Sequence, residues 1–363
     1  MKAQVIKQNV GSDISKDDFK VNFHQLLSTQ HIRIKGSRTF KNTLTGFRVF
    51  VAWVEKLRDL SVEVRITMEA TGVYYEQLVH YLHHQTDYHI SVVLANTTKA
   101  YFKSLNLKSK TDKIDAKALG QMGLERDIEK WEPLSDQIRI LKQLTRDRVN
   151  LLNQKTALSN RLHALNYSYL PHKQVIKRLK QQIRLIQKQL KEVEKQIQQL
   201  INTDSIIKER IDKICQLKGL GLVTVATIIA ETGGFVLFTS RAQLISYAGY
   251  DVVQKESGSS VKGKTRISKK GNKHIRRALH FPAMTAIKYD PGLKHLYDRV
   301  FDRSKIKMKA LVAVQRKLLL LIYTLFKKNQ AYDIDYEKDS SKHNEDKAIT
   351  KSCRQDTLPA YAG

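Results

Sequence analysis

Hydrophobic positions in the first third of the chain switch repeatedly between the periodicity of a strand and that of a helix. Short alternating stretches predict strands at residues 4–13, 19–24, 31–35, 64–68 and 89–94. Apolar spacings of three and four, or helix-compatible composition, predict helices at residues 47–60, 74–84, 97–104 and 111–124. Three strands followed by alternating helices and strands are typical of an α/β layer domain. We therefore predict such a domain over residues 1–128.

A heptad pattern marks the middle of the chain. Apolar residues recur at alternating spacings of three and four, the a/d pattern of a coiled coil, at Ile176, Leu179, Ile183, Ile186, Leu190, Val193, Ile197 and Leu200. An upstream run has the same period but is interrupted by Arg148 and Lys155. Pro171 separates the two runs and should end the first helix. We predict a coiled-coil helical hairpin over 134–205, whose helices could pair with each other or with a second chain.

The last patterned part, residues 211–330, is predicted to be mostly helical. Gly219 and Gly221 precede an apolar helix at 223–231, which resembles a helix-hairpin-helix whose backbone amides could meet a phosphate. An ordinary glycine-containing turn explains the same residues. A loop rich in Gly, Ser and Lys is expected at 254–272. The apolar segment 311–326 contains polar residues and predicts a buried amphipathic helix. Residues 331–363 are polar and unpatterned, so we expect a disordered tail.

Charge and composition narrow the class of protein. The chain has 64 Lys and Arg against 35 Asp and Glu, a formal charge of +29, and such a field attracts polyanions. A merely solubilising basic surface is the plainer alternative. Cys215 and Cys353 are too few for a disulfide framework or a zinc site. No apolar run approaches ~20 residues and the start lacks a signal peptide's apolar stretch, so we expect a cytoplasmic protein without a membrane span.

Acidic residues recur where predicted elements begin or end. Asp13 and Glu69 each end a predicted strand, and Asp112 and Asp115 share one face of a helix that Thr111 would cap. Their convergence would suit phosphoryl transfer, in which two divalent cations ~3.5–4 Å apart clamp the scissile phosphate. Oxygen ligands favour Mg²⁺. Taken singly, each acid has a plainer interpretation as turn chemistry, a solvated side chain or a partner of the helix dipole.

Basic residues concentrate between Gln254 and Arg277, where nine Lys or Arg accompany one acid, Glu256. Glycines within this stretch would let the backbone approach a ligand closely. A solvated charge run is the alternative interpretation. We predict contacts to nucleic acid from Lys255, Lys262, Lys264, Arg266, Lys269, Lys270, Asn272, Lys273, Arg276 and Arg277.

Three acidic segments resemble a known family. The segments at 10–16 (VGSDISK), 68–72 (MEATG) and 110–116 (KTDKIDA) resemble the amino-terminal domain of DEDD-type insertion-sequence transposases. That family includes Piv-type DNA invertases and bridge-RNA-guided recombinases. The resemblance implies a RuvC-like, ribonuclease-H-type fold and metal ligation by Asp13, Glu69, Asp112 and Asp115. Ser12 departs from the expected apolar residue, and we expect it to weaken the end of the first strand.

A second resemblance lies in the helical part and concerns the same family's carboxy-terminal transposase domain. It is carried by the segments at 217–221 (LKGLG), 247–250 (YAGY), 255–258 (KESG) and 269–279 (KKGNKHIRRAL). The resemblance implies that Ser257 is a nucleophile. From the residues alone, Ser259 and Ser260 compete with it, and a serine beside a glycine is usually part of a turn. The stretch 101–110 mixes aromatic and basic residues in a way that suits RNA.

The predicted function is therefore a Mg²⁺-dependent DNA transposase or site-specific recombinase. The resemblance implies a prokaryotic, nucleoid-associated enzyme that exchanges strands of donor and target DNA. It further implies a structured non-coding guide RNA as partner, and we expect a dimer or tetramer held by the coiled coil. One alternative is a hydrolytic Holliday-junction nuclease that needs the four acids and no serine. Another is a non-enzymatic nucleic-acid-binding protein. Metal-dependent cleavage and a covalent protein–DNA adduct would separate the three.

Overall fold

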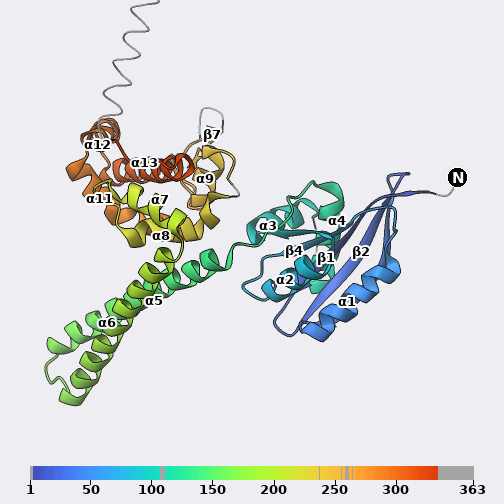
Figure 1. Ribbon diagram of the computed structural model, residues 1–363, viewed down its shortest axis with the longest axis horizontal. Coiled ribbons are helices and arrows are strands. Elements are labelled where there is room, and N and C mark those ends of the chain that lie inside the picture. Colours follow the sequence, from blue (N-terminus) through green and yellow to red (C-terminus); the bar gives the residue numbers. More distant parts are fainter. Residues whose placement is uncertain are drawn as a thin grey trace, which may run out of the picture. The chain divides into compact units, whose positions relative to one another are not determined.

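The computed structural model describes residues 3–106, 111–236, 238–254, 256–257, 261–263 and 265–333. The chain forms two compact units, Met1–Pro133 and Leu134–Gly363 (Figure 1). Several predictions fall outside the described residues. These are the contacts from Lys255 and Lys264, the competing serines Ser259 and Ser260, the end of the 101–110 stretch, and the tail from residue 334 on.

The first unit is a mixed α/β layer, as predicted. Its strands are β1 (Val5–Ile14), β2 (Asp18–Leu27), β3 (Ile32–Lys41), β4 (Val64–Glu69) and β5 (His89–Val93). Its helices are α1 (Leu44–Leu57), α2 (Glu76–Gln85), α3 (Ala95–Ser104) and α4 (Asp112–Glu125). The sheet has the order β3-β2-β1-β4-β5. Strands β1 to β3 run antiparallel, whereas β1, β4 and β5 pair in parallel.

Two sequence expectations about these strands need correction. Strand β3 runs on to Lys41, well past the predicted end at 35, because it lies at the sheet edge and its mostly exposed residues lack an apolar alternation. Ser12 does not interrupt the pairing of β1. It is fully buried and paired with both Val21 and Met68, and the strand continues to Ile14. Pairing on both sides holds this part of the strand, whatever the side chain's polarity.

The two faces of the sheet differ in chemistry. One face is apolar and aromatic, and its buried residues pack with those of α1 and α2 into one core that includes Val10, Phe19, Phe23, Ile66, Phe47, Phe50 and Leu78. The opposite face presents Asn9 and Gly11 of β1 to helix α4. Asn9 Nδ2 donates to the Gly120 carbonyl at 2.8 Å, so a buried polar residue ties the helix to the strand.

The second unit begins with the predicted pair of long helices. Helices α5 (Asp136–Asn166) and α6 (Lys173–Asn202) form a hairpin, drawn in green in Figure 1. The a/d residues Leu179, Ile186, Leu190, Val193 and Ile197 are all buried. Helix α6 packs along α5, so the heptad seam has a partner within its own chain.

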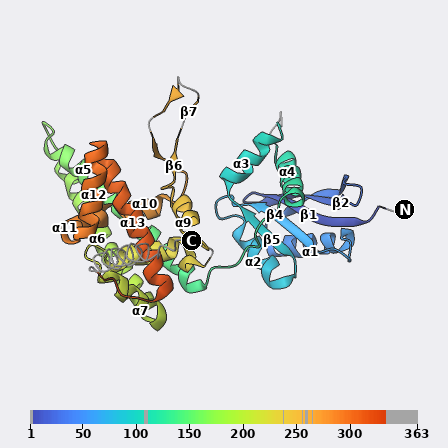
Figure 2. The same ribbon diagram turned by 90° about the horizontal axis from the view of Figure 1, so that it is seen from above.

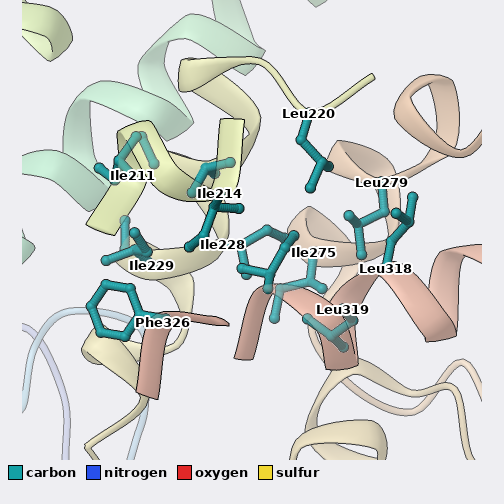
Figure 3. Packing of buried hydrophobic residues seen from close by; sticks show 14 of the residues in the cluster. Ile211, Ile214, Leu220, Ile228, Ile229, Ile275, Leu279, Leu318, Leu319 and Phe326 are labelled. Carbon is teal, nitrogen blue, oxygen red and sulfur yellow. The ribbon is translucent and has the colours of Figure 1, made fainter. Parts of the chain in front are cut away.

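The rest of the second unit is mostly helical, as predicted. It comprises α7 (Ser205–Cys215), α8 (Leu222–Glu231), the short 3₁₀ helix η1 (Gly233–Phe235), α9 (Arg241–Ala248), α10 (Lys273–Ala278), α11 (His280–Tyr289), α12 (Pro291–Ser304) and α13 (Lys307–Lys328). Figure 3 shows its core, where α7, α8, α10 and α13 contribute side chains such as Ile214, Ile228, Ile275 and Leu319. Helix α8 is buried from Val225 to Glu231 because it lies inside this core.

The expected loop at 254–272 contains short strands instead. Strands β6 (Val252–Val253) and β9 (Arg266–Ile267) pair antiparallel, as do β7 (Glu256–Ser257) and β8 (Val261–Lys262). Strands of two residues are too short for an alternating pattern to reveal them. Among the described residues, no helix is both long and apolar enough to cross a membrane.

Candidate functional site

Asp13 and Glu69 lie at the same edge of the sheet. Strands β1 and β4 are parallel neighbours, and Ser12 pairs with Met68. The next position along each strand is Asp13 on β1 and Glu69 on β4. Because parallel strands present their carboxyl ends at one edge and paired positions share a face, both acids start from the same side of the sheet. Their placement agrees with the sequence prediction.

Helix α4 brings Asp112 and Asp115 to this edge. Its first turn contains both acids, and Thr111 caps it by accepting a hydrogen bond from the Ile114 amide at 3.3 Å, as predicted. Glycines let the helix approach the sheet closely. A Cβ added to Gly11 would lie 2.1 Å from the Ala116 carbonyl oxygen, and one added to Gly120 would lie 2.1 Å from His24 Nδ1. The backbone of α4 therefore lies almost directly on β1 and β2.

The other three acids act electrostatically on Asp13. Burial raises the pKa of Asp13, and the like charges of Asp112, Asp115 and Glu69 raise it further, to about 6. Lys20, which pairs with Asp13 across β1 and β2, opposes this rise. The Lys20 ammonium also donates to Asp112 Oδ2 at 2.5 Å. A single lysine therefore supplies positive charge to two of the acids.

Glu69 has a neutral partner that orients its carboxylate. The Thr98 hydroxyl of α3 donates to Glu69 Oε2 at 2.5 Å, and Thr98 is fully buried. Sequence reasoning missed both Thr98 and Lys20. Thr98 has no local signal, whereas Lys20 stands at the start of the strand that pairs with β1. Its position opposite Asp13 becomes visible only once the antiparallel register is known.

The donor set fits a divalent cation in its chemistry. The four side chains offer only carboxylate oxygens, which hard divalent cations such as Mg²⁺ prefer. Burial and the charges of the other three acids raise the pKa of Asp13, and a bound cation would relieve the repulsion part of this effect. Within the part of the chain that the structure describes, no three His, Cys, Asp or Glu side chains already converge closely enough to hold a metal ion.

Ser257 belongs to the second unit and lies on β7. Its backbone pairs with Val261, next to the pairing of Glu256 with Lys262. Figure 2 shows β6 and β7 extending away from α9 and α10. We call the two short strand pairs, β6–β9 and β7–β8, the ladder. Ser257 lies on β7, at the end of the ladder that is farther from α9 and α10 (Figure 2). Four of the predicted basic contacts, Arg266, Lys269, Lys270 and Lys273, are exposed at or near its base.

Three of the predicted nucleic-acid contacts already have partners within the fold. Asn272 caps α10 and donates to Glu231 Oε2 at 2.7 Å. Arg276 donates to the Ala248 carbonyl at 2.7 Å, and Gly249 allows this close approach because a Cβ there would lie 2.6 Å from the guanidinium. Arg277 is exposed but donates to Asn153 of α5 at 2.7 Å. These contacts anchor the base of the ladder.

The anchor centres on Glu231, which sequence reasoning missed. Its side chain is fully buried, and Arg146 of α5 binds both carboxylate oxygens at 2.7 and 2.9 Å. Burial raises the pKa of Glu231, but the hydrogen bonds from Arg146 and Asn272 outweigh it and hold the pKa below its usual value. In the sequence, Glu231 is the one acid at the end of a mostly apolar helix. Because a buried charge needs a partner, this position could have indicated a buried ion pair.

The glycine motif at 217–221 joins two helices, α7 and α8. Gly219 has a φ of +106°, a conformation that other residues rarely adopt. Gly221 stands at the N-cap of α8, where an added Cβ would meet no atom within 4 Å. The space beside Gly221 is therefore open.

The first unit gathers acidic residues at one sheet edge, and the whole chain carries a formal charge of +29, which favours binding to polyanions. A family model described as a transposase, of the DEDD type, matches residues 10–171. A second, described as the transposase IS116/IS110/IS902 family, matches residues 211–298. The protein is thus a DNA recombinase of the transposase class. It belongs to the IS116/IS110/IS902 family of transposases, which confirms the resemblance seen in the sequence.

Individual relatives agree with this membership. The chain is 28% identical over 338 residues to the pilin gene-inverting protein of Moraxella bovis, covering 90% of this chain and 98% of that protein. It is 27% identical over 138 residues to an uncharacterized 42 kDa protein of insertion element IS900 from Mycobacterium paratuberculosis, covering 36% of this chain and 34% of that one. A structural match to a Ppx/GppA family member from Aquifex aeolicus has a TM-score of 0.22, too low to indicate a shared fold.

Proposed function

We propose that this transposase cuts and rejoins DNA with a carboxylate site in its first unit and a serine nucleophile in its second. The observation that carries the proposal is the placement of Asp13, Glu69 and the first turn of α4 at one edge of the sheet. By resemblance, the first unit has a RuvC-like, ribonuclease-H-type fold. Its sheet order supports this, because three antiparallel strands are followed by two parallel ones with acids at the ends of β1 and β4.

Asp13, Glu69, Asp112 and Asp115 would hold two Mg²⁺ ions. The bound cations would neutralise charge on the scissile phosphate and lower the pKa of the attacking oxygen. Thr98 would keep the Glu69 carboxylate oriented, and Lys20 would hold Asp112 until a cation replaces it. Both residues act on ligands and do not touch the DNA in this scheme.

Ser257 would attack the phosphorus of one DNA strand. A bond forms between Ser257 Oγ and phosphorus, the serine proton passes to a carboxylate, and the bond to the leaving strand oxygen breaks as that oxygen takes up a proton. A hydroxyl from the other strand end then reverses these steps and frees the serine. A serine hydroxyl needs such activation because its own pKa is high.

The wider organisation is proposed on the same basis. We divide the chain into a catalytic domain (1–128), a coiled-coil hairpin (134–205), a carboxy-terminal transposase domain (211–330) and a tail (331–363). A dimer or tetramer would let acids and serines of different chains cooperate. DNA inversion, named for the Moraxella relatives, is the reaction we propose to test first. Guidance by a structured RNA follows from the family resemblance and suits the net charge of +29.

The decisive experiment detects a covalent adduct. Protein is incubated with labelled element DNA, its non-coding RNA and Mg²⁺, and then run on a denaturing gel. We expect an adduct from the wild type, none from Ser257→Ala, and near-normal adduct from the matched controls Ser259→Ala and Ser260→Ala. DNA binding by Ser257→Ala should be unchanged, because one hydroxyl adds little to many phosphate contacts.

Two outcomes would contradict parts of the proposal. An adduct that persists in Ser257→Ala would remove that serine from the mechanism. Cleavage without any adduct in the wild type would favour a hydrolytic nuclease, which needs only the acids of the first unit. Replacing Glu69 or Asp115 by Ala should abolish cleavage and keep binding, and a variant that still cleaves at the wild-type rate would exclude that ligand.

A further inference from the structure

The outer half of the α5–α6 hairpin carries charge of one sign only. We call residues 149–187 the helical arm. The arm contains seven Lys or Arg residues, and the chain has no Asp or Glu anywhere between Asp147 and Glu192. Where the arm begins, Arg148 is neutralised by Glu194 across the hairpin at 2.7 Å. Within the described residues, no ion pair involves a basic residue of the arm itself.

The positive charge on α6 is arranged as a stripe. Its exposed members are Lys173, Lys177, Lys180, Arg184, Lys188, Lys191 and Lys195. Their spacings of four and three keep them on one side of a helix with 3.6 residues per turn. The stripe lies to one side of the buried heptad seam and extends about 33 Å at 1.5 Å per residue. Among the residues that the structure describes, the one salt bridge that involves the stripe joins Lys188 to Glu192 at 3.8 Å.

The stripe leads to an exposed aromatic tip. In the turn between α5 and α6, Tyr167, Tyr169 and Leu170 are 81%, 95% and 81% exposed. Tyr167 contacts the ring of His163 at 4.8 Å, while Tyr169 is almost fully in solvent. Large side chains gathered this openly mark an interaction site more often than an ordinary surface. Figure 1 shows the tip at the far end of the hairpin from α8.

We propose that the helical arm binds nucleic acid, with backbone phosphates along the α6 stripe and unpaired bases stacked on the tyrosines of the tip. The stripe supplies counter-charges for successive phosphates. Aromatic side chains bind unpaired bases by stacking, which tolerates any sequence. The sequence pattern left open whether the helices of this hairpin pair with each other or with a second chain, and in the structure most of the apolar seam is buried against α5 of the same chain.

A second copy of the chain is a poorer occupant of the arm. The arm itself has no acids, so two arms would repel each other. The whole chain carries +29, so the net charge of a second copy would add to that repulsion. A polyanion is therefore the partner whose charge complements the stripe. The same chemistry could come from DNA or from RNA, and the experiment distinguishes the two.

The test measures binding of the full chain by fluorescence anisotropy in the presence of a chelator. The probes are a stem-loop and the same stem as a blunt duplex, each made in DNA and in RNA. Arg184→Gln removes a stripe charge, and Arg178→Gln removes the same charge from the same helix about 120° away. Both arginines are exposed. We expect Arg184→Gln to weaken every probe several-fold and to reduce the salt slope by about one, with little effect from Arg178→Gln.

The tip is tested with a second matched pair. Tyr169→Ala should weaken the stem-loop about tenfold and leave the blunt duplex unchanged, whereas Tyr169→Phe keeps the ring and should bind as the wild type does. Tighter binding of the RNA stem-loop than of the DNA one would identify RNA as the source.

Three results would overturn the inference. The first is equal effects of Arg184→Gln and Arg178→Gln. The second is an unchanged preference for the loop in Tyr169→Ala. The third is a loss of oligomer mass in Tyr169→Ala without any loss of nucleic-acid binding, which would assign the tip to a second chain. The choice of ligand rests on the proposed function. Because binding is measured without divalent metal, however, failure of the serine or carboxylate chemistry would not alter these results.

Discussion

The pKa of Asp13 shows the electrostatic effect of placing four acids at one sheet edge. Its pKa of about 6 lies above the ordinary value of 3.8 because the carboxyl group is partly buried and faces Asp112, Asp115 and Glu69. In the absence of a cation, the folded protein therefore binds a proton at Asp13 more tightly than the unfolded chain does. Stability contributed by the protonated form is complete below about pH 4 and is lost as the pH rises through 6.

This shift predicts that Asp13→Asn stabilises the metal-free protein at neutral pH. At pH 7.5 with a chelator, we expect the free energy of unfolding to rise by on the order of 1–2 kcal/mol, because the variant removes a repelled charge. At pH 4 the gain should vanish. Denaturant unfolding at both pH values measures this. The control, Asp17→Asn, alters an exposed acid in the following turn and should change little.

Divalent cation provides a second readout of the same site. Adding Mg²⁺ should raise the melting temperature of the wild type, because a ligand that binds only the folded state stabilises it. Asp13→Asn should lose most of this gain. If Asp13→Asn were no more stable than the wild type at pH 7.5 with chelator, the four acids would not interact as the raised pKa of Asp13 indicates.

Helix α6 has an apolar side that packs on α5 and a basic side that is exposed. Its a/d side chains face α5, while the basic stripe is displaced around the helix and remains in solvent. Leu190 and Leu185 illustrate the two environments, since they are 7% and 56% exposed on the same helix. The buried seam between α5 and α6 therefore stabilises the hairpin within one chain. The exposed surface of the hairpin is not needed for this packing and can bind a partner.

The two leucines make a matched pair for testing the seam. Leu190→Asp should destabilise the second unit by about 3 kcal/mol or more, because it buries an unpaired carboxylate. Leu185→Asp should stay within about 0.5 kcal/mol of the wild type. Circular dichroism of the helices during denaturant unfolding measures both. A fall in oligomer mass of Leu190→Asp by light scattering, with no loss of stability, would show that the seam joins chains after all.

For the chain as a whole, the net positive charge should determine how strongly binding to nucleic acid depends on salt. A protein of +29 that contacts many phosphates releases many counterions, so its affinity must depend steeply on salt. We expect affinity for DNA to fall about 10³-fold between 50 and 200 mM salt. Anisotropy titrations across this range measure the slope. A shallow slope would mean that few of the basic residues contact phosphates.

A control separates binding from catalysis at this level. Asp115→Asn should bind DNA with the same salt slope as the wild type and at least equal affinity, because it removes one repelling charge from an acidic site. It should nevertheless fail to cleave. A large loss of affinity in Asp115→Asn would show that the acids of the first unit support DNA binding or folding, and not chemistry alone.

Much of this organisation was visible in the sequence because it depends on local patterns. Period-two and heptad alternation predicted the sheet of the first unit and the helices α5 and α6, and the position of Thr111 predicted the cap of α4. The order of the acidic and basic motifs was enough to predict the family. Each of these signals involves residues that are close in sequence, so neighbouring side chains alone carry them.

Contacts between distant residues could not be read in this way. The pairing of Lys20 with Asp112, the support of Glu69 by Thr98 and the anchoring of Asn272 on Glu231 join residues that are 92, 29 and 41 positions apart. The partner of the heptad seam was likewise undecided, because the same apolar stripe fits a helix of its own chain or of another. Such pairings depend on which surfaces meet when the chain packs, and only the folded structure brings those surfaces together.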